Sequence, residues 1–178
     1  MKTITSSIKK ATSFVLLTLL TSISFSQENP SLSDAEVASV AVVANQIDIS
    51  YADIAMKRSK NKDILEFAER MITDHNAVIE QAVALVTKLN VSPKDNAVSQ
   101  SLMDGSEKTK KMLKKANKKE FDKLYIDNEV AYHKAVISAI KKLLIPETDN
   151  AELKKLLETV LPALEAHLGH AEMVQNKI

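Results

Sequence analysis

Apolar residues recur along this chain in steps of three and four, the spacing that gathers them on one face of an α-helix. The pattern predicts four long helices, over about 33–57, 61–90, 119–144 and 150 to nearly the end of the chain. No segment alternates apolar and polar residues with a period of two, so we predict no β-sheet. An average step of 3.5 residues is typical of helices packed about 20° from parallel, as in a four-helix bundle.

Local signals mark the ends of these helices. Ser33, with Glu36 three residues later, has the spacing of a capping box, and Asn61 is suited to cap the second helix. Pro93 ends that helix, and Pro162 inside the fourth predicts a kink. Capping residues and prolines therefore mark the ends of the helices that the apolar pattern predicts.

The connection between the second and third predicted helices is unusually long, at about 28 residues, for neighbours in a tight bundle. Residues 94–118 contain helical pieces, which we expect to be broken at Asp104-Gly105. Roughly 18 helical residues cover about 27 Å, enough to return the chain along a bundle. We therefore expect an all-α, ferritin-like four-helix bundle, in which this partly helical crossover joins two antiparallel hairpins. A simple up-and-down bundle with a decorated loop is the alternative.

Residues 1–26 have the features of a secretory signal peptide. Lys2, Lys9 and Lys10 precede an apolar to hydroxylic stretch from Ala11 to Phe25, and Ser24-Phe25-Ser26 offers small residues for cleavage. A membrane-spanning helix needs about 20 apolar residues, so a retained anchor is the less favoured interpretation. We expect an exported protein in which residues 27–178 form a single domain.

Composition narrows the classes of protein and of site. With no cysteine, the chain has no disulfide, thiolate metal site or cysteine nucleophile, and two glycines among 178 residues are too few for turn-rich folds. Without the three lysines of residues 1–26, acidic residues outnumber basic ones by two, so we expect no nucleic-acid partner. No glycine-flanked serine indicates a nucleophilic hydrolase.

One stretch departs from this balance, because eight lysines crowd between residues 108 and 123. A solvated helix face is the simplest interpretation of this lysine cluster. Docking to anionic lipid or lipopolysaccharide phosphates in a cell envelope is the functional alternative. The cluster consists of Lys108, Lys110, Lys111, Lys114, Lys115, Lys118, Lys119 and Lys123.

Each of the four apolar series carries one titratable residue near the middle of its helix. Mid-helix positions lie at similar heights in a bundle whatever the helix directions, so we expect these four groups to converge. Glu129 lies one turn before His133, and His170 lies three residues after His167 on the same face. The candidate metal ligands are therefore Asp48, His75, Glu129, His133, His167 and His170.

Imidazole and carboxylate groups are the nitrogen and oxygen ligands of divalent metals such as zinc, iron or manganese. Burying them in an apolar seam is costly unless they are paired, hydrogen-bonded or bound to an ion. A metal-free polar layer, with the histidines paired to Asp48, Glu129 and Glu165, is the alternative to a metal site. Tyr51, Tyr125 and Tyr132 lie within about a turn of these groups, and packing with a hydrogen-bonded hydroxyl is their simplest role.

Three stretches resemble one known family. They run from Phe67 to His75, from Phe121 to Tyr125 with His133 following, and from Leu161 to Leu168. Together they resemble domain-of-unknown-function family 4142, over nearly all of residues 34–174. The resemblance implies an exported bacterial protein with a ferritin-like bundle, periplasmic or associated with the outer membrane. It also implies that the positions marking the family are Asp74, His75, His133, Pro162 and His167.

The resemblance to this family implies a fold and a cellular location but does not identify a reaction. Ferritins that hold two irons carry a glutamate and a Glu-x-x-His motif in each half, whereas this chain has Asp-His, Glu-x-x-x-His and Glu-x-His-x-x-His. Ferroxidase chemistry is therefore not carried over. We expect an envelope protein without established enzymatic activity, acting in metal handling or envelope stress. A ferritin-like metal-dependent oxidoreductase and a structural or partner-binding bundle are the alternatives.

Overall fold

The computed structural model describes residues 31–178, so the predicted signal peptide lies outside the described residues. Across this part of the chain the structure is helical, without strands. The helices are α1 (Asp34–Arg58), α2 (Lys62–Lys88), α3 (Ala97–Lys115), α4 (Phe121–Ala139), a π-helical turn η1 (Ile140–Leu144), α5 (Ile145–Glu147) and α6 (Ala151–Gln175). The all-α prediction is confirmed.

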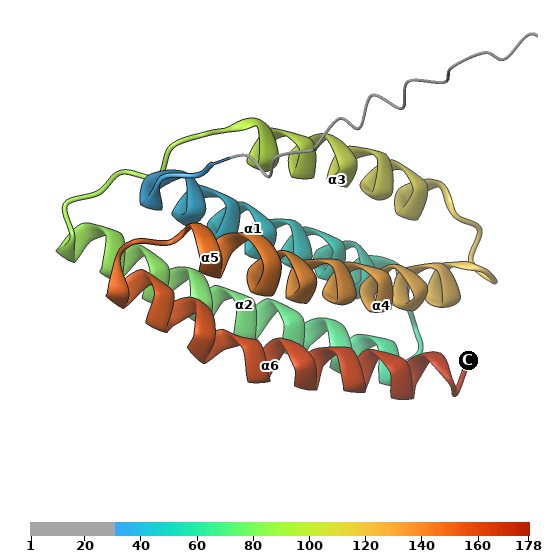
Figure 1. The fold of residues 1–178 in the computed structure, drawn as a ribbon. Helices are drawn as coiled ribbons and strands as arrows, with labels where there is room; N and C mark the ends of the chain where they lie inside the picture. Colours follow the sequence, from blue (N-terminus) through green and yellow to red (C-terminus); the bar gives the residue numbers. More distant parts are fainter. Residues whose placement is uncertain (1–30) are drawn as a thin grey trace, which may run out of the picture.

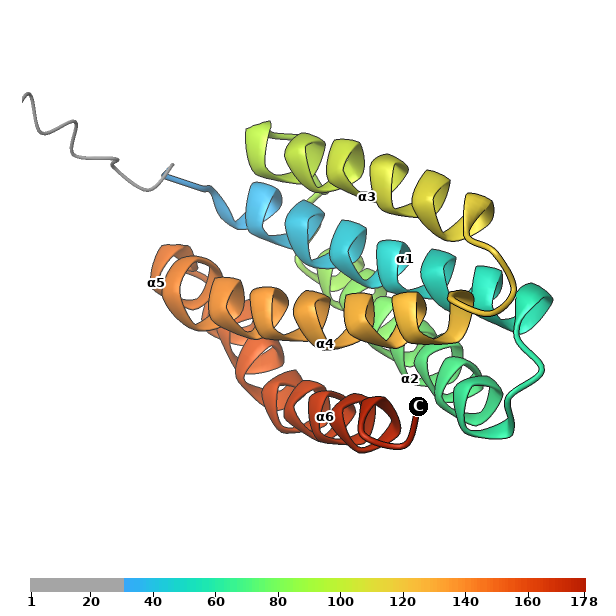
Figure 2. The same cartoon turned by 90° about the vertical axis from the view of Figure 1, so that its right-hand side faces the viewer.

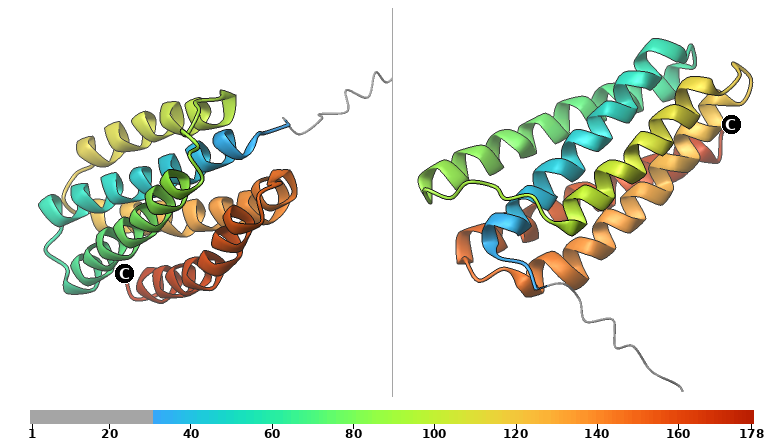
Figure 3. Two further views of the ribbon diagram at one scale, coloured as in Figure 1. Left: turned by 90° about the vertical axis from the view of Figure 1, so that its left-hand side faces the viewer. Right: turned by 90° about the horizontal axis from the view of Figure 1, so that it is seen from above.

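Four long helices form the bundle and the crossover helix lies outside it (Figures 1 and 2). The hairpin of α1 and α2 packs against the hairpin of α4, η1, α5 and α6, with α1 beside α4 and α2 beside α6. Figure 3 shows α2 and α4 running in the same direction, so the chain must travel the length of the bundle between them. Helix α3 makes that return along the outside of α1, as a long crossover requires.

Hydrogen bonds at the helix starts follow the caps expected from the sequence. The backbone N–H and the hydroxyl of Ser33 donate to Glu36 Oε2 at 3.0 and 2.8 Å. Asn61 Oδ1 accepts from the backbone N–H of Asp63 at 3.0 Å. Each side chain satisfies N–H groups that have no partner within their own helix, which fixes where the helix begins.

The expected break at Asp104-Gly105 is wrong, because α3 continues without interruption from Ala97 to Lys115. A glycine inside a helix costs only about 1 kcal/mol relative to alanine, which packing and caps outweigh. Asn96 caps α3 by accepting from the N–H groups of Val98 and Ser99, while Leu113 is completely buried. At the other end, the Arg58 guanidinium donates to the carbonyl oxygens of Leu113 and Ala116.

The end of the third predicted helix is a π-helical turn, which directly follows α4. Pro146 lies at the start of the short α5, and α6 then continues through Pro162 as one helix. Figure 1 shows α6 as curved along its length. None of the described helices is long and apolar enough to cross a bilayer.

Two apolar clusters fill the bundle, one on each side of a polar layer at mid-height. The first includes Phe67 and Tyr125, and the second includes Leu153 and Leu157. Along α2, α4 and α6 the chain passes from one cluster to the other at His75, His133 and His167, and Asp48 of α1 lies next to Ile47 of the first cluster. The buried histidine and acidic residues of the core lie in this polar layer, which contains the candidate site.

The continuity of α3 predicts that Gly105→Ala stabilises the protein. A Cβ at Gly105 meets no atom within 4 Å, so alanine adds helix propensity without a clash. We expect the free energy of unfolding to rise by about 0.5–1 kcal/mol. Urea denaturation followed by circular dichroism measures this change. Gly105→Pro is the opposite control and should destabilise; a destabilising Gly105→Ala would contradict an unbroken helix at this position.

Candidate metal centre

Five ionisable side chains from four helices meet in the polar layer and are almost excluded from solvent. The relative exposures are 0% for Asp48 and Glu129, 1% for His133, 2% for His167 and 4% for His75. Asp48 comes from α1, His75 from α2, Glu129 and His133 from α4, and His167 from α6. All five are candidate ligands identified in the sequence, and the structure brings them together.

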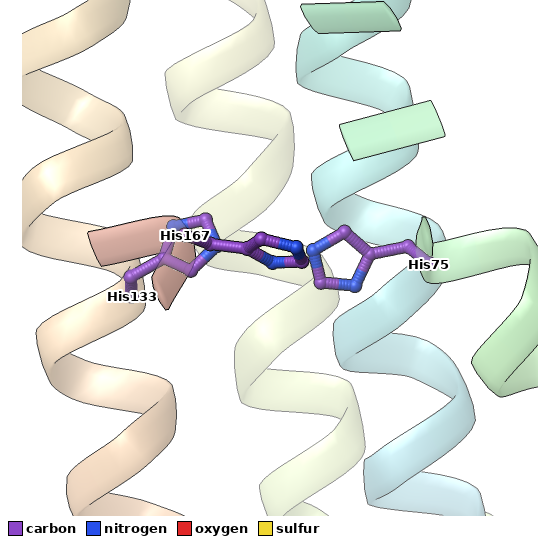
Figure 4. Close-up of side chains that lie close together, drawn as sticks. All are labelled: His75, His133 and His167. Carbon is purple, nitrogen blue, oxygen red and sulfur yellow. The ribbon is translucent and has the colours of Figure 1, made fainter. Parts of the chain in front are cut away.

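The three imidazole rings point toward one another (Figure 4). Each of His75, His133 and His167 offers one ring nitrogen, and these atoms lie within 4.8 Å of one another. Nitrogens bound to one zinc ion at about 2 Å must lie within about 4 Å of one another. A side-chain adjustment of about an ångström would therefore let the three rings share one ion.

Hydrogen bonds on the outer side of the rings determine which nitrogen faces inward. His133 Nδ1 lies 2.9 Å from the backbone oxygen of Glu129, and His75 Nδ1 lies 2.7 Å from Asn45 Oδ1. Asn45 in turn donates its amide N–H to the Ala41 carbonyl oxygen, which turns Oδ1 toward His75. Since both partners are acceptors, each ring donates from Nδ1 and carries its lone pair on Nε2.

His167 is oriented in the opposite sense. Its Nε2 donates to Asp74 Oδ2 at 2.8 Å, which leaves the lone pair on Nδ1. Burial would raise the pKa of Asp74, but hydrogen bonds from His167 and Arg70 hold it below its usual value. The group that orients this ring is therefore an ionised carboxylate.

The inward-facing atoms form a buried set of polar groups that do not satisfy one another. Within the described part of the chain, His75 Nε2, His133 Nε2 and His167 Nδ1 have no hydrogen-bond partner, and neither do the carboxylate oxygens of Asp48 and Glu129. Asp48 Oδ2 lies 3.4 Å from His75 Nε2 and 3.6 Å from His133 Nε2. Polar atoms without partners in an apolar interior are unfavourable, and a cation would satisfy those that bind it.

A second group of ligand atoms adjoins the three histidines. Asp48, Glu129 and His133 each offer one atom within 4.8 Å of the others, so His133 belongs to both groups. Glu129 Oε2 lies 3.8 Å from His133 Nδ1. That nitrogen is the one that donates to the Glu129 carbonyl oxygen, so Glu129 lies beside the centre, whereas Asp48 faces the inward nitrogens of His75 and His133.

Burial shifts the proton affinities of these groups toward their neutral forms. It lowers the pKa of His75 to about 3, assisted by the charges of His133 and His167, and that of His133 to about 4. Burial also raises the pKa of Asp48 to about 8, and the pKa of Glu129 rises well above its usual value through burial and the charge of Asp48. Neutral imidazole is the form that binds metal, whereas the carboxyl groups would release protons to an ion.

Other residues considered from the sequence lie apart from these groups. His170 belongs to neither ligand group and packs edge-on against Phe67, with ring centroids 5.3 Å apart. Glu165 is exposed and pairs with Lys141 Nζ at 2.6 Å, so it satisfies no histidine of the layer. The Tyr132 hydroxyl donates to the Ala44 carbonyl oxygen at 2.8 Å, as expected of a packed tyrosine.

Sequence reasoning missed how the rings are held. Asn45 lies three residues before Asp48 on the same face of α1, a spacing that could have marked it as part of the layer. Asp74 is adjacent to His75 in sequence but orients His167 on another helix. Only the docking of α2 against α6 makes that pair, and no local pattern reports it.

Fold and site together define a helical bundle with a buried histidine and carboxylate cluster. The chain belongs to the family described as a domain of unknown function, DUF4142, whose model matches residues 21–174. No curated protein matches its sequence. A crystal structure of a DUF305 fragment from Deinococcus radiodurans is similar to it, with a TM-score of 0.71 and 12% sequence identity. The match covers 82% of this chain and 96% of that one, and at this identity it shows the fold alone.

The unpaired carboxyl of Asp48 predicts that Asp48→Asn stabilises the metal-free protein. Burial raises its pKa in the folded state to about 8, from an ordinary value of 3.8, so folding disfavours the charged form. The resulting loss in the free energy of unfolding is absent below about pH 4. It grows by up to about 1.4 kcal/mol per pH unit as the pH rises, and it is complete above about pH 8. An asparagine amide would also donate to the histidine lone pairs.

Urea denaturation in the presence of a chelator, at pH 5 and pH 9, tests this expectation. The advantage of Asp48→Asn over the wild type should be larger at pH 9, and comparison of the two proteins cancels the histidine titrations that they share. A variant less stable than the wild type at pH 9 would show that Asp48 is well satisfied without a metal.

Proposed function

We propose that this protein is an exported, metal-binding bundle of the bacterial envelope, which holds a divalent ion in its polar layer. One observation carries the proposal. Three buried histidines from three helices are each oriented by an acceptor on the outer side, and their unpartnered nitrogens converge. Metal-binding histidines typically donate their second ring N–H to a carboxylate or a carbonyl oxygen in this way.

The donor set favours a borderline transition metal. Three imidazoles with the carboxylates of Asp48 and Glu129 suit zinc, iron or manganese, whereas calcium and magnesium prefer oxygen ligands. His75, His133, His167 and Asp48 would hold the ion, with Glu129 beside them. A bound ion would supply positive charge and Lewis acidity in a site shielded from water. Asn45 and Asp74 would keep the rings oriented by accepting their outer N–H protons.

Metal handling in the envelope is the role that this site supports best. The apolar stretch of residues 11–25, preceded by three lysines, supports export, and nearly complete burial suits retention of an ion. A metal-dependent oxidoreductase is the second candidate, favoured by the group of Asp48, Glu129 and His133 that adjoins the histidines. Such an enzyme would turn over oxygen or peroxide when loaded with iron or manganese, which a zinc-binding protein would not do.

We expect the purified protein to bind about one divalent ion per chain and to lose it in His75→Ala or His133→Ala. Each substitution removes one nitrogen from the centre. His170→Ala is the matched control, because this histidine lies on α6 but in neither ligand group. Elemental analysis after dialysis against zinc, iron or manganese measures the stoichiometry, and circular dichroism verifies the fold.

The thermal midpoint gives a second measurement on the same samples. An ion that binds only the folded chain raises it, by the equivalent of about 2.7 kcal/mol at a hundred times the dissociation constant. Metal content that is unchanged in His75→Ala, or lost equally in His170→Ala, would refute the site.

We further propose that the lysine cluster docks the bundle on anionic envelope lipids. Six of its members are exposed on or just after α3, namely Lys108, Lys111, Lys114, Lys115, Lys118 and Lys119. The other two are engaged, Lys110 with Glu107 and Lys123 with Asp127. Clustered exposed lysines are attracted to anionic headgroups at about 1 kcal/mol each near the surface.

Co-sedimentation with vesicles tests this docking. We expect binding to vesicles that contain phosphatidylglycerol, little binding to pure phosphatidylcholine vesicles, and a marked loss between low and physiological salt as charges are screened. Replacing Lys114 and Lys115 with glutamine should weaken the binding. Binding that is independent of salt would exclude an electrostatic docking surface.

A further inference from the structure

A cavity of about 610 Å³ opens inside the bundle directly beside the polar layer. Its polar end is formed by Asn45, Asp48, Asp74, His75, His133 and His167, and its remaining walls are almost entirely apolar. Pockets that hold small molecules usually measure about 300–1,000 Å³ and combine apolar walls with a few convergent polar groups. This cavity has both properties, with its polar groups confined to one end.

The cavity is elongated along the bundle axis. On α2 its lining extends from His75 to Val86, which corresponds to about 16 Å of helix. On α6 it extends in the same direction, from His167 back to Leu153. The shape is therefore that of a channel leading away from the candidate ligands.

Small side chains and the π-helical turn create this space. Ala41, Ala82 and Ala139 line the cavity where larger residues would fill the core. Ile140 and Leu144, at the two ends of η1, also face it. π-Helical turns within helices occur frequently at functional sites, and here the turn follows the helix that carries His133.

The cavity reaches the surface between α2 and α6. Ala77 and Gln81 on α2, and Thr159 and Ala163 on α6, both line it and are exposed. All four side chains are small or uncharged, so no charged group among them would hinder an apolar molecule. This gap offers an entry route that does not pass through the polar layer.

We infer that the cavity binds a long-chain aliphatic carboxylate, with its hydrocarbon chain along the apolar walls and its carboxylate on the metal ion held by the histidines. This inference rests on the proposed metal site. Three neutral imidazoles and the Asp48 carboxylate would leave a divalent ion with one positive charge, and these residues form the end of the cavity. Zinc can expand from four ligands to five, which gives a further carboxylate a place on the ion. Of the two other carboxyl groups nearby, Asp74 pairs with Arg70 and Glu129 does not line the cavity. A second carboxylate is the complementary ligand.

The distribution of polar groups selects this class of molecule over others. Apolar cavities are poorly hydrated, so water is an unfavourable occupant of the long arm. Flat cofactors with polar groups around their edges would bury those groups against alanine, valine and leucine without partners. A molecule with a single polar end and a flexible aliphatic chain leaves none of its groups unsatisfied.

Calorimetric titration of zinc-loaded protein with dodecanoate and hexadecanoate, below their aggregation concentrations, tests the inference. We expect about one equivalent to bind, and the methyl esters to bind at least about tenfold more weakly because they lack the charged head. Ala82→Phe should reduce binding by at least about tenfold by filling the cavity. Ala84→Phe is the matched control, since Ala84 is exposed on the same helix outside the lining.

Metal content is measured on every sample, so that the two proposals can fail separately. A zinc-loaded protein that binds no fatty acid, or binds it equally well after Ala82→Phe, overturns the cavity inference and leaves the metal site standing. Equal binding of acid and methyl ester overturns the placement of the carboxylate on the ion. A chain that binds no metal overturns the proposed function and this placement together.

Discussion

The structure is organised around the free-energy cost of taking ionisable groups out of water. An apolar residue at any of these mid-helix positions would have continued the core, yet each of the four bundle helices carries a carboxyl or imidazole group there. Outer hydrogen bonds satisfy one side of every ring, and nothing within the described protein satisfies the inner side. The fold thus keeps a set of buried polar atoms at a cost in free energy that a bound cation would reduce.

The polar layer was predictable because helices in a bundle have a regular spacing of buried positions and lie side by side over their whole length. Steps of three and four place His75 and His133 on the buried faces of their helices, and mid-helix position sets their common height. These two rules need no knowledge of topology, which explains why the local pattern located five converging groups. The same rules placed His170 with them, but they could not show that its ring packs against Phe67 instead.

Two features of the structure could not be predicted from the sequence. They depend on contacts between helices and on small free-energy differences between competing local conformations. The pairing of Asp74 with His167 depends on how α2 docks against α6. The continuity of α3 depends on a cap at Asn96 and on burial of Leu113, which together outweigh the intrinsic cost of Gly105. The Asp74–His167 pair has no signature in a short window of residues, and the Asn96 cap, which is local, marks only where α3 begins and not that it continues through Gly105.

The ligands are divided between the two hairpins: Asp48 and His75 belong to the first, and Glu129, His133 and His167 to the second. An ion at their centre would cross-link the two hairpins. Helices α2 and α6, which flank the mouth of the cavity, also come from different halves. Occupancy of the centre would therefore control how far those halves can separate, and with it the passage of molecules into the interior.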